Sequence, residues 1–149
     1  GGPWSYMDDP SRAAYAKLEA SLAAMPREIG ATPAAVLMIS AHWEEPEFTL
    51  MANPRPPMVY DYYGFPDYTY QIRYEAPGSP SLAEHARQLI EAAGMPARLD
   101  PQRGFDHGAF TPLKIIYPAS DAPVVQLSLK AGLDPSTHLA VGLYSCHRK

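Results

Sequence analysis

The spacing of hydrophobic positions along the chain changes several times, and each change predicts a different element. Apolar residues recur at helical spacing over residues 13–25, which predicts an amphipathic helix. Asp9 is suited to cap this helix with Pro10 in its first turn, and Pro26 and Gly30 are expected to mark its end. Residues 34–39 are apolar throughout, as is typical of a strand that is covered on both faces in a parallel sheet.

The rest of the chain alternates between short apolar runs and amphipathic stretches. Ser81 with Glu84 behind it forms a capping-box pattern, which predicts a helix that Gly94 closes. Asp134, directly before a proline, predicts the start of the last helix. The pattern also predicts strands over residues 46–51, 69–74, 98–99 and 123–129, and helices over residues 111–117 and 137–144. This alternation predicts a single α/β domain whose central sheet, mostly parallel or mixed, is flanked by helices.

Composition places the chain among soluble globular proteins. Of its 149 residues, 46% are hydrophobic and 19% are charged. No run approaches the roughly 20 apolar residues of a membrane helix, so no membrane span is expected. A formal net charge of −4 argues against a nucleic-acid partner. The single cysteine, Cys146, excludes an internal disulfide framework and a multi-cysteine zinc site, and it favours a cytoplasmic location.

Tyrosines are concentrated in residues 58–74, where Gly64 and Pro66 interrupt the first half. The second half, residues 69–74, alternates enough to predict an edge strand. Most of these tyrosines are expected to pack against that strand and to hydrogen-bond through their hydroxyls. The alternative is that a few of them line a pocket for an aromatic substrate.

His42 is the first candidate for chemistry, because it follows the predicted strand over residues 34–39. Ligands of open α/β sheets bind beyond the carboxyl ends of the strands, which favours a functional histidine at this place. The alternative is a histidine that only hydrogen-bonds within a loop. With Glu44 it matches the His-x-Glu pattern of zinc deaminases, but the cysteine pair of that motif is missing.

His107 is the second candidate, in a loop bounded by Gly104 and Gly108. A histidine there suits general acid/base catalysis, and the alternative is a turn with a surface histidine. Asp106 is adjacent, but adjacency in sequence does not make it the orienting partner of His107. No role in catalysis is expected for the remaining histidines or the cysteine: His85, His138, His147 and Cys146.

Four sequence blocks carry a family resemblance that extends to about Gly142. They are ISAHWE (39–44), YDYYGFP (60–66), YEAPGSP (74–80) and GFDHGAFTPL (104–113). In this order they resemble the class III extradiol ring-cleaving dioxygenases. Within that family they are closest to the DOPA 4,5-dioxygenase-like branch, which is related to the LigB subunit of protocatechuate dioxygenase. Several matched blocks in one order are a more specific indication than any single motif.

The resemblance implies an oxidoreductase that opens the ring of a DOPA-like or related aromatic diol with O2 at a non-haem metal. The metal implied is normally Fe(II), and zinc is also found in this branch. By the same resemblance His42 is a metal ligand, and His107 is a catalytic, substrate-binding histidine that assists proton transfer. Neutral imidazole suits Fe(II), and a nearby histidine can take the second catechol proton.

The resemblance also implies that residues 1–149 form a partial catalytic domain that is truncated at both ends. Family members open with a histidine-glycine loop that supplies another metal ligand, whereas this chain opens on Gly1. They also continue past the last helix to a further acid/base histidine and another metal ligand. Glu44, Glu45 and His147 have no spacing that supports them as substitutes.

A sheet without all of its strands leaves an apolar edge uncovered, so a homo-oligomer is expected. Two alternatives to the catalytic hypothesis follow from the same residues. One is an inactive remnant of the fold that binds an aromatic ligand or a protein partner. The other is a metal-dependent enzyme of another reaction type on the same scaffold.

Overall fold

The computed structural model describes residues 2–8 and 10–147, with the side chains of residues 11 and 143–147 left undescribed. The strands are β1 (Val36–Glu45), β2 (Phe48–Met51), β3 (Ala97–Asp100) and β4 (Val124–Lys130). The helices are α1 (Ala16–Ile29), α2 (Pro80–Ala92), α3 (His107–Ile116) and α4 (Pro135–His147). Short 3-10 helices are η1 (Trp4–Tyr6), η2 (Pro10–Tyr15) and η3 (Asp67–Gln71).

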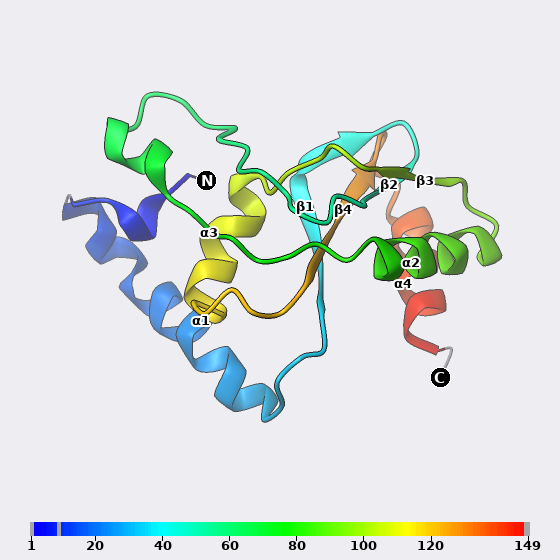
Figure 1. Ribbon diagram of the computed structural model, residues 1–149, viewed down its shortest axis with the longest axis horizontal. Helices are drawn as coiled ribbons and strands as arrows, with labels where there is room; N and C mark the ends of the chain where they lie inside the picture. Colours follow the sequence, from blue (N-terminus) through cyan, green and yellow to red (C-terminus); the bar gives the residue numbers. More distant parts are fainter. Residues whose placement is uncertain (1, 9, 148–149) are drawn as a thin grey trace.

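The sheet lies between two layers of helices (Figure 1). Among the described residues it has four strands in the order β1-β4-β2-β3. β1 pairs with β4 and β2 with β3 in parallel, whereas β2 meets β4 antiparallel. Figure 1 shows α1 and α3 on one side of the sheet and α2 and α4 on the other. The predicted α/β domain with a mixed sheet flanked by helices is therefore confirmed.

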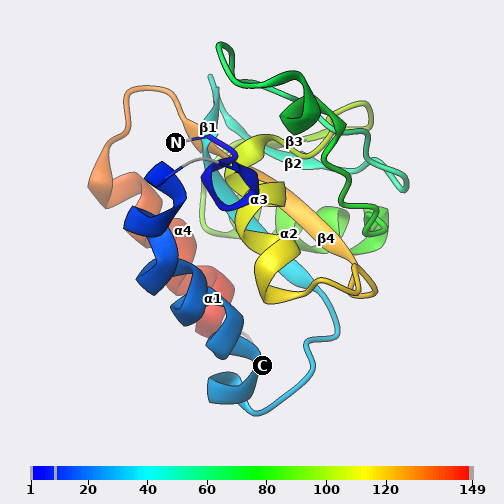
Figure 2. The same ribbon diagram turned by 90° about the vertical axis from the view of Figure 1, so that its left-hand side faces the viewer.

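Two apolar clusters hold these layers together. The one towards α3 includes Trp43, Met51, Tyr62, Tyr74, Phe105 and Phe110. The one towards α2 and α4 includes Phe48, Leu50, Ala83, Ile90, Leu127 and Val141. In Figure 2 the α1 side faces the viewer, and α3 crosses in front of the sheet. The burial of these side chains is the main favourable contribution to folding.

The first strand differs from the prediction in one respect. β1 is a strand in a parallel pair, as expected, but it is not covered on both faces. Among the described strands it pairs only with β4, which places it at the edge of the sheet. Leu37 and Ile39, on one face of β1, are 42% and 57% exposed. No helix within the described part of the chain is both long and apolar enough to cross a membrane.

The predicted edge strand over residues 69–74 is wrong, because η3 extends to Gln71 and residues 72–74 belong to no strand. Thr69 turns the chain there, since both its backbone N–H and its hydroxyl donate to the carbonyl oxygen of Pro66. The expected hydroxyl bonds do form, but they tie the segment to itself. Tyr60 donates to the Ile72 carbonyl at 2.7 Å, and Tyr62 to the Thr69 carbonyl at 2.6 Å.

Helix ends account for most of the other differences. α1 continues through Pro26, one of its two predicted end residues, and is closed by the other, Gly30, which adopts a left-handed φ of 69° that favours glycine. α2 is capped by Ser79, whose hydroxyl accepts from the Leu82 N–H, and not by Ser81. Asp134 caps α4, as predicted, by accepting the Thr137 N–H at 2.9 Å. The predicted cap Asp9 lies outside the described residues.

Candidate active site

His42 lies in a bulge of β1 and not beyond the end of the strand. The register with β4 is regular up to Ser40 and resumes only at Glu44. Residues 41–43 have no partner in this register, so they form a β-bulge, a feature that commonly re-aims a side chain. The His42 side chain is 42% exposed. The predicted strand was therefore too short, but its carboxyl-terminal part does present the histidine.

His107 is the first residue of α3, and it is buried. The carboxylate of Asp106 accepts the Ala109 N–H at 3.1 Å and so caps the helix. The helix thus begins at His107, ahead of the predicted start at Thr111. Because His107 is only 6% exposed, the alternative of a surface histidine in a turn is wrong.

Asp61, from the tyrosine-rich segment, joins the two histidines. Its Oδ1 accepts the backbone N–H of His107 at 2.9 Å and lies 2.8 Å from His107 Nδ1. Its Oδ2 lies 4.0 Å from Nδ1 of His42. Sequence analysis did not identify Asp61 as a functional residue. The one indication was its place as the acid of the YDYYGFP block, between tyrosines.

The two histidine rings pack against each other, with centroids 4.0 Å apart. Gly108 makes room for this contact, because a Cβ there would lie 2.6 Å from Cδ2 of His42 and 2.9 Å from Oγ of Ser40. Tyr62 approaches His107 from another side, in an edge-to-face contact with centroids 5.6 Å apart. Both histidine rings are therefore held by their neighbours.

Asp106 is a fully buried carboxylate that braces the surrounding scaffold. Its oxygens accept from the Ser40 hydroxyl at 2.7 Å and pair with Arg103 at 2.9 Å, and the Gln126 amide donates to it as well. Arg103 in turn lies over the Trp43 ring, 4.7 Å from its centroid. A buried charge needs such partners to offset its desolvation. These bonds join β1, β4 and α3 beside the histidines.

The partners of Asp106 also show that it does not orient the histidine that follows it. Asp61 has that contact, and its environment favours the charged form. Partial burial would raise the pKa of Asp61, but the two hydrogen bonds from His107 outweigh this effect and hold that pKa below its ordinary value. The site thus has a carboxylate fixed between two imidazoles.

The three side chains form a donor set for a metal ion. Ligand atoms of His42, Asp61 and His107 all lie within 4.8 Å of one another. Imidazole nitrogen and carboxylate oxygen are donors that Fe(II) and Zn(II) both accept. His107 Nε2 is buried without a hydrogen-bond partner among the described residues, which suits a site that takes a ligand. The residues present therefore fit a divalent metal.

The other candidates from the sequence lie apart from this group. The Glu45 carboxylate accepts from the Trp43 indole N–H and pairs with Arg98, while Glu44 is exposed on β1. His85 is exposed on α2. His138 has the expected structural role, since it donates to the Asp134 carbonyl and accepts the Lys130 N–H. The side chains of His147 and Cys146 are outside the described residues.

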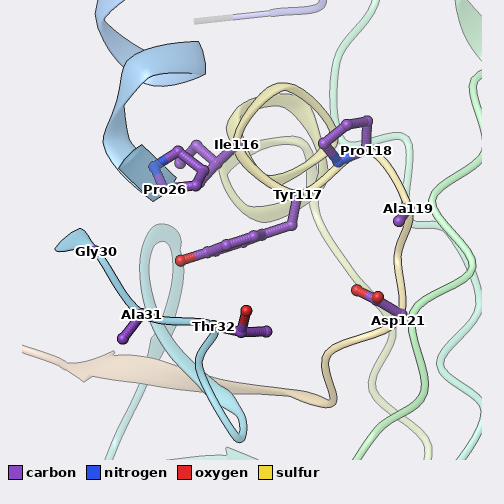
Figure 3. A pocket seen from close by; sticks show the side chains of 9 residues that line it. All are labelled: Pro26, Gly30, Ala31, Thr32, Ile116, Tyr117, Pro118, Ala119 and Asp121. Atoms are coloured by element: carbon purple, nitrogen blue, oxygen red, sulfur yellow. The ribbon is translucent and has the colours of Figure 1, made fainter. Parts of the chain in front are cut away.

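A hollow of about 390 Å³ lies elsewhere, between the carboxyl ends of α1 and α3 (Figure 3). Its lining includes Pro26, Thr32, Tyr117 and Asp121. His107 begins α3, and a helix of 10 residues is about 15 Å long, so this hollow is at the far end of the helix from the histidines. It is not part of the candidate site.

Relatives with curated names match most of the chain. It is 41% identical over 111 residues to dioxygenase tasH of Hapsidospora irregularis, covering 74% of this chain and 34% of that protein. It is 42% identical to the 4,5-DOPA dioxygenase extradiol of Beta vulgaris, with 74% of this chain and 41% of that protein covered. The chain thus spans about two fifths or less of the length of these relatives.

A solved structure and a family comparison agree with these relatives. The crystal structure of the uncharacterized protein JW3007 from Escherichia coli K12 superposes with a TM-score of 0.57 at 33% identity, covering 74% of this chain and 39% of that one. The family described as the catalytic LigB subunit of aromatic ring-opening dioxygenase matches residues 5–143. That match contains the bulge of β1, the tyrosine-rich segment and the start of α3, so the chain belongs to the LigB family of aromatic ring-opening dioxygenases.

Proposed function

We propose that this chain is part of an extradiol dioxygenase that opens the ring of an aromatic diol, DOPA-like or related, with O2. The observation that supports the proposal most is the meeting of His42, Asp61 and His107 on a LigB scaffold. The relatives' names support the substrate class, since several are called 4,5-DOPA dioxygenase extradiol. Both oxygen atoms enter the product, so the reaction needs no external reductant.

The metal would be held by His42, whose ligand nitrogen lies within 4.8 Å of polar atoms of Asp61 and His107. We propose Fe(II), with zinc as the alternative occupant, because nitrogen and carboxylate donors serve both ions. When bound, the metal would hold the diol and activate O2. The exposed side of His42 leaves open positions for both reactants.

His107 would act on the diol as a base. It is buried, and its Nε2 has no hydrogen-bond partner among the described residues. A neutral imidazole nitrogen can accept the proton of a substrate hydroxyl, and Asp61 would stabilise the imidazolium that forms. We therefore assign His107 the catalytic and substrate-binding role, and His42 the role of metal ligand.

The remaining features of the proposal concern the whole protein. We propose that residues 1–149 are part of a catalytic domain, which the partial coverage of the relatives supports. We also propose that copies of the chain associate along β1, whose exposed Leu37 and Ile39 support it. The cytoplasm is the proposed location, supported by the single cysteine.

Oxygen uptake tests the proposed reaction. The protein is loaded anaerobically with Fe(II), mixed with DOPA, catechol or protocatechuate, and exposed to oxygen. We expect uptake together with a yellow semialdehyde. His42→Ala should abolish it, and His107→Ala should lower kcat by about 10²- to 10⁴-fold with metal affinity largely kept.

His85→Ala is the matched control, because this exposed histidine lies on α2 away from the site. It should leave uptake unchanged. Absence of uptake with all three diols, from protein shown to bind Fe(II), would contradict the proposed reaction for this chain and favour a remnant that only binds ligands. Hydrolysis of an ester or amide without oxygen uptake would instead indicate a different metal-dependent reaction.

A further inference from the structure

We propose that Asp61 is the positioning residue of His107: it accepts the Nδ1–H of the ring and so leaves Nε2 as a lone-pair acceptor towards the substrate. The role of this arrangement in ring opening rests on the proposed function. The arrangement itself follows from the contacts around His107.

The first contact fixes both the backbone and the ring of His107. One carboxylate oxygen, Oδ1 of Asp61, is 2.9 Å from the His107 backbone nitrogen and 2.8 Å from ring Nδ1. The backbone N–H can only donate, and an ionised carboxylate can only accept. Nδ1 must therefore carry a hydrogen to bond the same oxygen, which sets the tautomer of the neutral ring.

The other sides of the ring are occupied by groups that offer Nε2 no partner. The His42 ring packs against it with centroids 4.0 Å apart. The Tyr62 ring meets it edge to face, with an interplanar angle of 88°, and the Tyr62 hydroxyl donates to the Thr69 carbonyl. Nε2 is buried and has no hydrogen-bond partner among the described residues. A buried polar atom left in this way points to a ligand as its partner.

Asp106, the other acid near His107, cannot replace Asp61. Its oxygens already accept from Ser40, Arg103, Gln126 and the Ala109 N–H, and it is 0% exposed. The two acids therefore have separate tasks. Asp106 braces the scaffold, and Asp61 holds the ring.

The tautomer decides which step His107 can perform. With hydrogen on Nδ1, Nε2 takes the proton of a diol hydroxyl, and the resulting imidazolium keeps its bond to Asp61. The electron pair of the broken O–H bond stays on the substrate oxygen. With hydrogen on Nε2 instead, the same atom could only donate, and the substrate would keep its proton. A carboxylate in this position commonly fixes the tautomer of a functional histidine.

The tautomer can be measured without any activity. Uniformly ¹⁵N-labelled, metal-free protein is studied by long-range ¹H–¹⁵N NMR at a pH where the histidines are neutral, and His107→Gln identifies the His107 signals. We expect hydrogen on Nδ1 in the original protein. Asp61→Asn should keep it, because its amide oxygen still accepts. Asp61→Ala should shift the ring towards the Nε2–H form.

Asp67→Ala is the control, since this exposed acid begins η3 in the same tyrosine-rich segment and does not belong to the group of His42, Asp61 and His107. It should leave the His107 signals unchanged. An Nε2–H ring in the original protein, or an unchanged tautomer in a folded Asp61→Ala variant, would overturn the proposal. Because Asp61→Asn preserves the shape of the side chain, it supplies a folded variant for the remaining measurements.

Zinc titration separates positioning from metal ligation. We expect His42→Ala to abolish Zn(II) binding, and Asp61→Asn and His107→Ala to weaken it by less than about 10-fold. If all three abolish it, the trio is the metal site itself and the positioning role is wrong. In oxygen uptake, Asp61→Asn should lower kcat by about 10- to 100-fold with KM little changed. A protein with the expected tautomer but no ring opening would contradict only the proposed function.

Discussion

The ring contact between His42 and His107 depends on the absence of a side chain at a neighbouring position. That position is Gly108, because a Cβ there would press on His42 and Ser40 at 2.6 and 2.9 Å. Both distances are too short for any real contact, and Ser40 is tied to Asp106. The glycine is thus required by close packing and not by its backbone conformation.

Gly108→Ala should therefore displace the His42 ring. We expect metal affinity to fall at least 10-fold, with a change in the free energy of unfolding of about 1–3 kcal/mol, as for other overpacked sites. Zinc titration and urea denaturation measure the two effects.

Gly142→Ala is a matched control on α4, where a new Cβ would meet nothing within 4 Å. It should leave zinc binding unchanged and stabilise the helix by up to about 1 kcal/mol. Equal zinc affinity in the Gly108→Ala variant would mean that the packing around His42 does not control metal binding.

At the scale of elements, the hydrophobic pattern predicted the regular strands, but it missed a segment whose shape depends on side-chain hydrogen bonds. The strands over residues 46–51 and 123–129 were predicted because their apolar runs enter the core. The segment over residues 69–74 was not, because Thr69 and the tyrosine hydroxyls fold the chain back on itself. The periodicity of hydrophobic residues does not reveal these hydrogen bonds.

The candidate site was predictable to a similar extent. His42 and His107 stood out because histidines next to a buried strand or between glycines suit chemistry. Asp61 did not, because its partner lies 46 residues further along the chain. The bulge of β1 escaped detection too, since it shows only in the register with β4. Contacts between distant residues become visible only in the folded chain.

Removing the hydroxyl is expected to have opposite effects on stability at two tyrosines of the segment over residues 58–74. The Tyr62 hydroxyl donates to the Thr69 carbonyl, whereas the Tyr74 hydroxyl is buried without a partner among the described residues. Tyr62→Phe should lower the free energy of unfolding by about 0.5–1.5 kcal/mol, and Tyr74→Phe should be neutral or stabilising. Urea denaturation of both variants compares them directly. A larger loss for Tyr74→Phe would show that its hydroxyl has a partner after all.

At the scale of the whole molecule, the edge of the sheet is the feature with the clearest consequence. Residues 36–41 of β1 carry no charge, although edge strands are commonly protected by charged side chains. Leu37 and Ile39 also border an apolar hollow of about 260 Å³, lined further by Phe48, Leu127 and Val141. An uncharged, apolar edge favours association with another copy of the chain.

Ile39→Lys should therefore shift the protein towards the monomer. Sedimentation velocity at several concentrations should show self-association of the original chain and its loss in the variant. Leu139→Lys, which changes an apolar residue that is 67% exposed on α4, is the control and should not alter association. A monomer at all concentrations for the original chain would contradict the proposed oligomer.

The long sequence separation of the contacts around the site has a consequence for the order in which the protein folds. Its bond to Ser40 spans 66 residues and that of Asp61 to His107 spans 46, and β1 must find β4 across the whole middle of the chain. Closing such long loops costs entropy before any contact compensates for it, and parallel pairing is slow for the same reason. The histidines should therefore come together late in folding. Trp43, packed under Arg103 in this region, offers a fluorescence probe to time that step against the burial of the rest of the core.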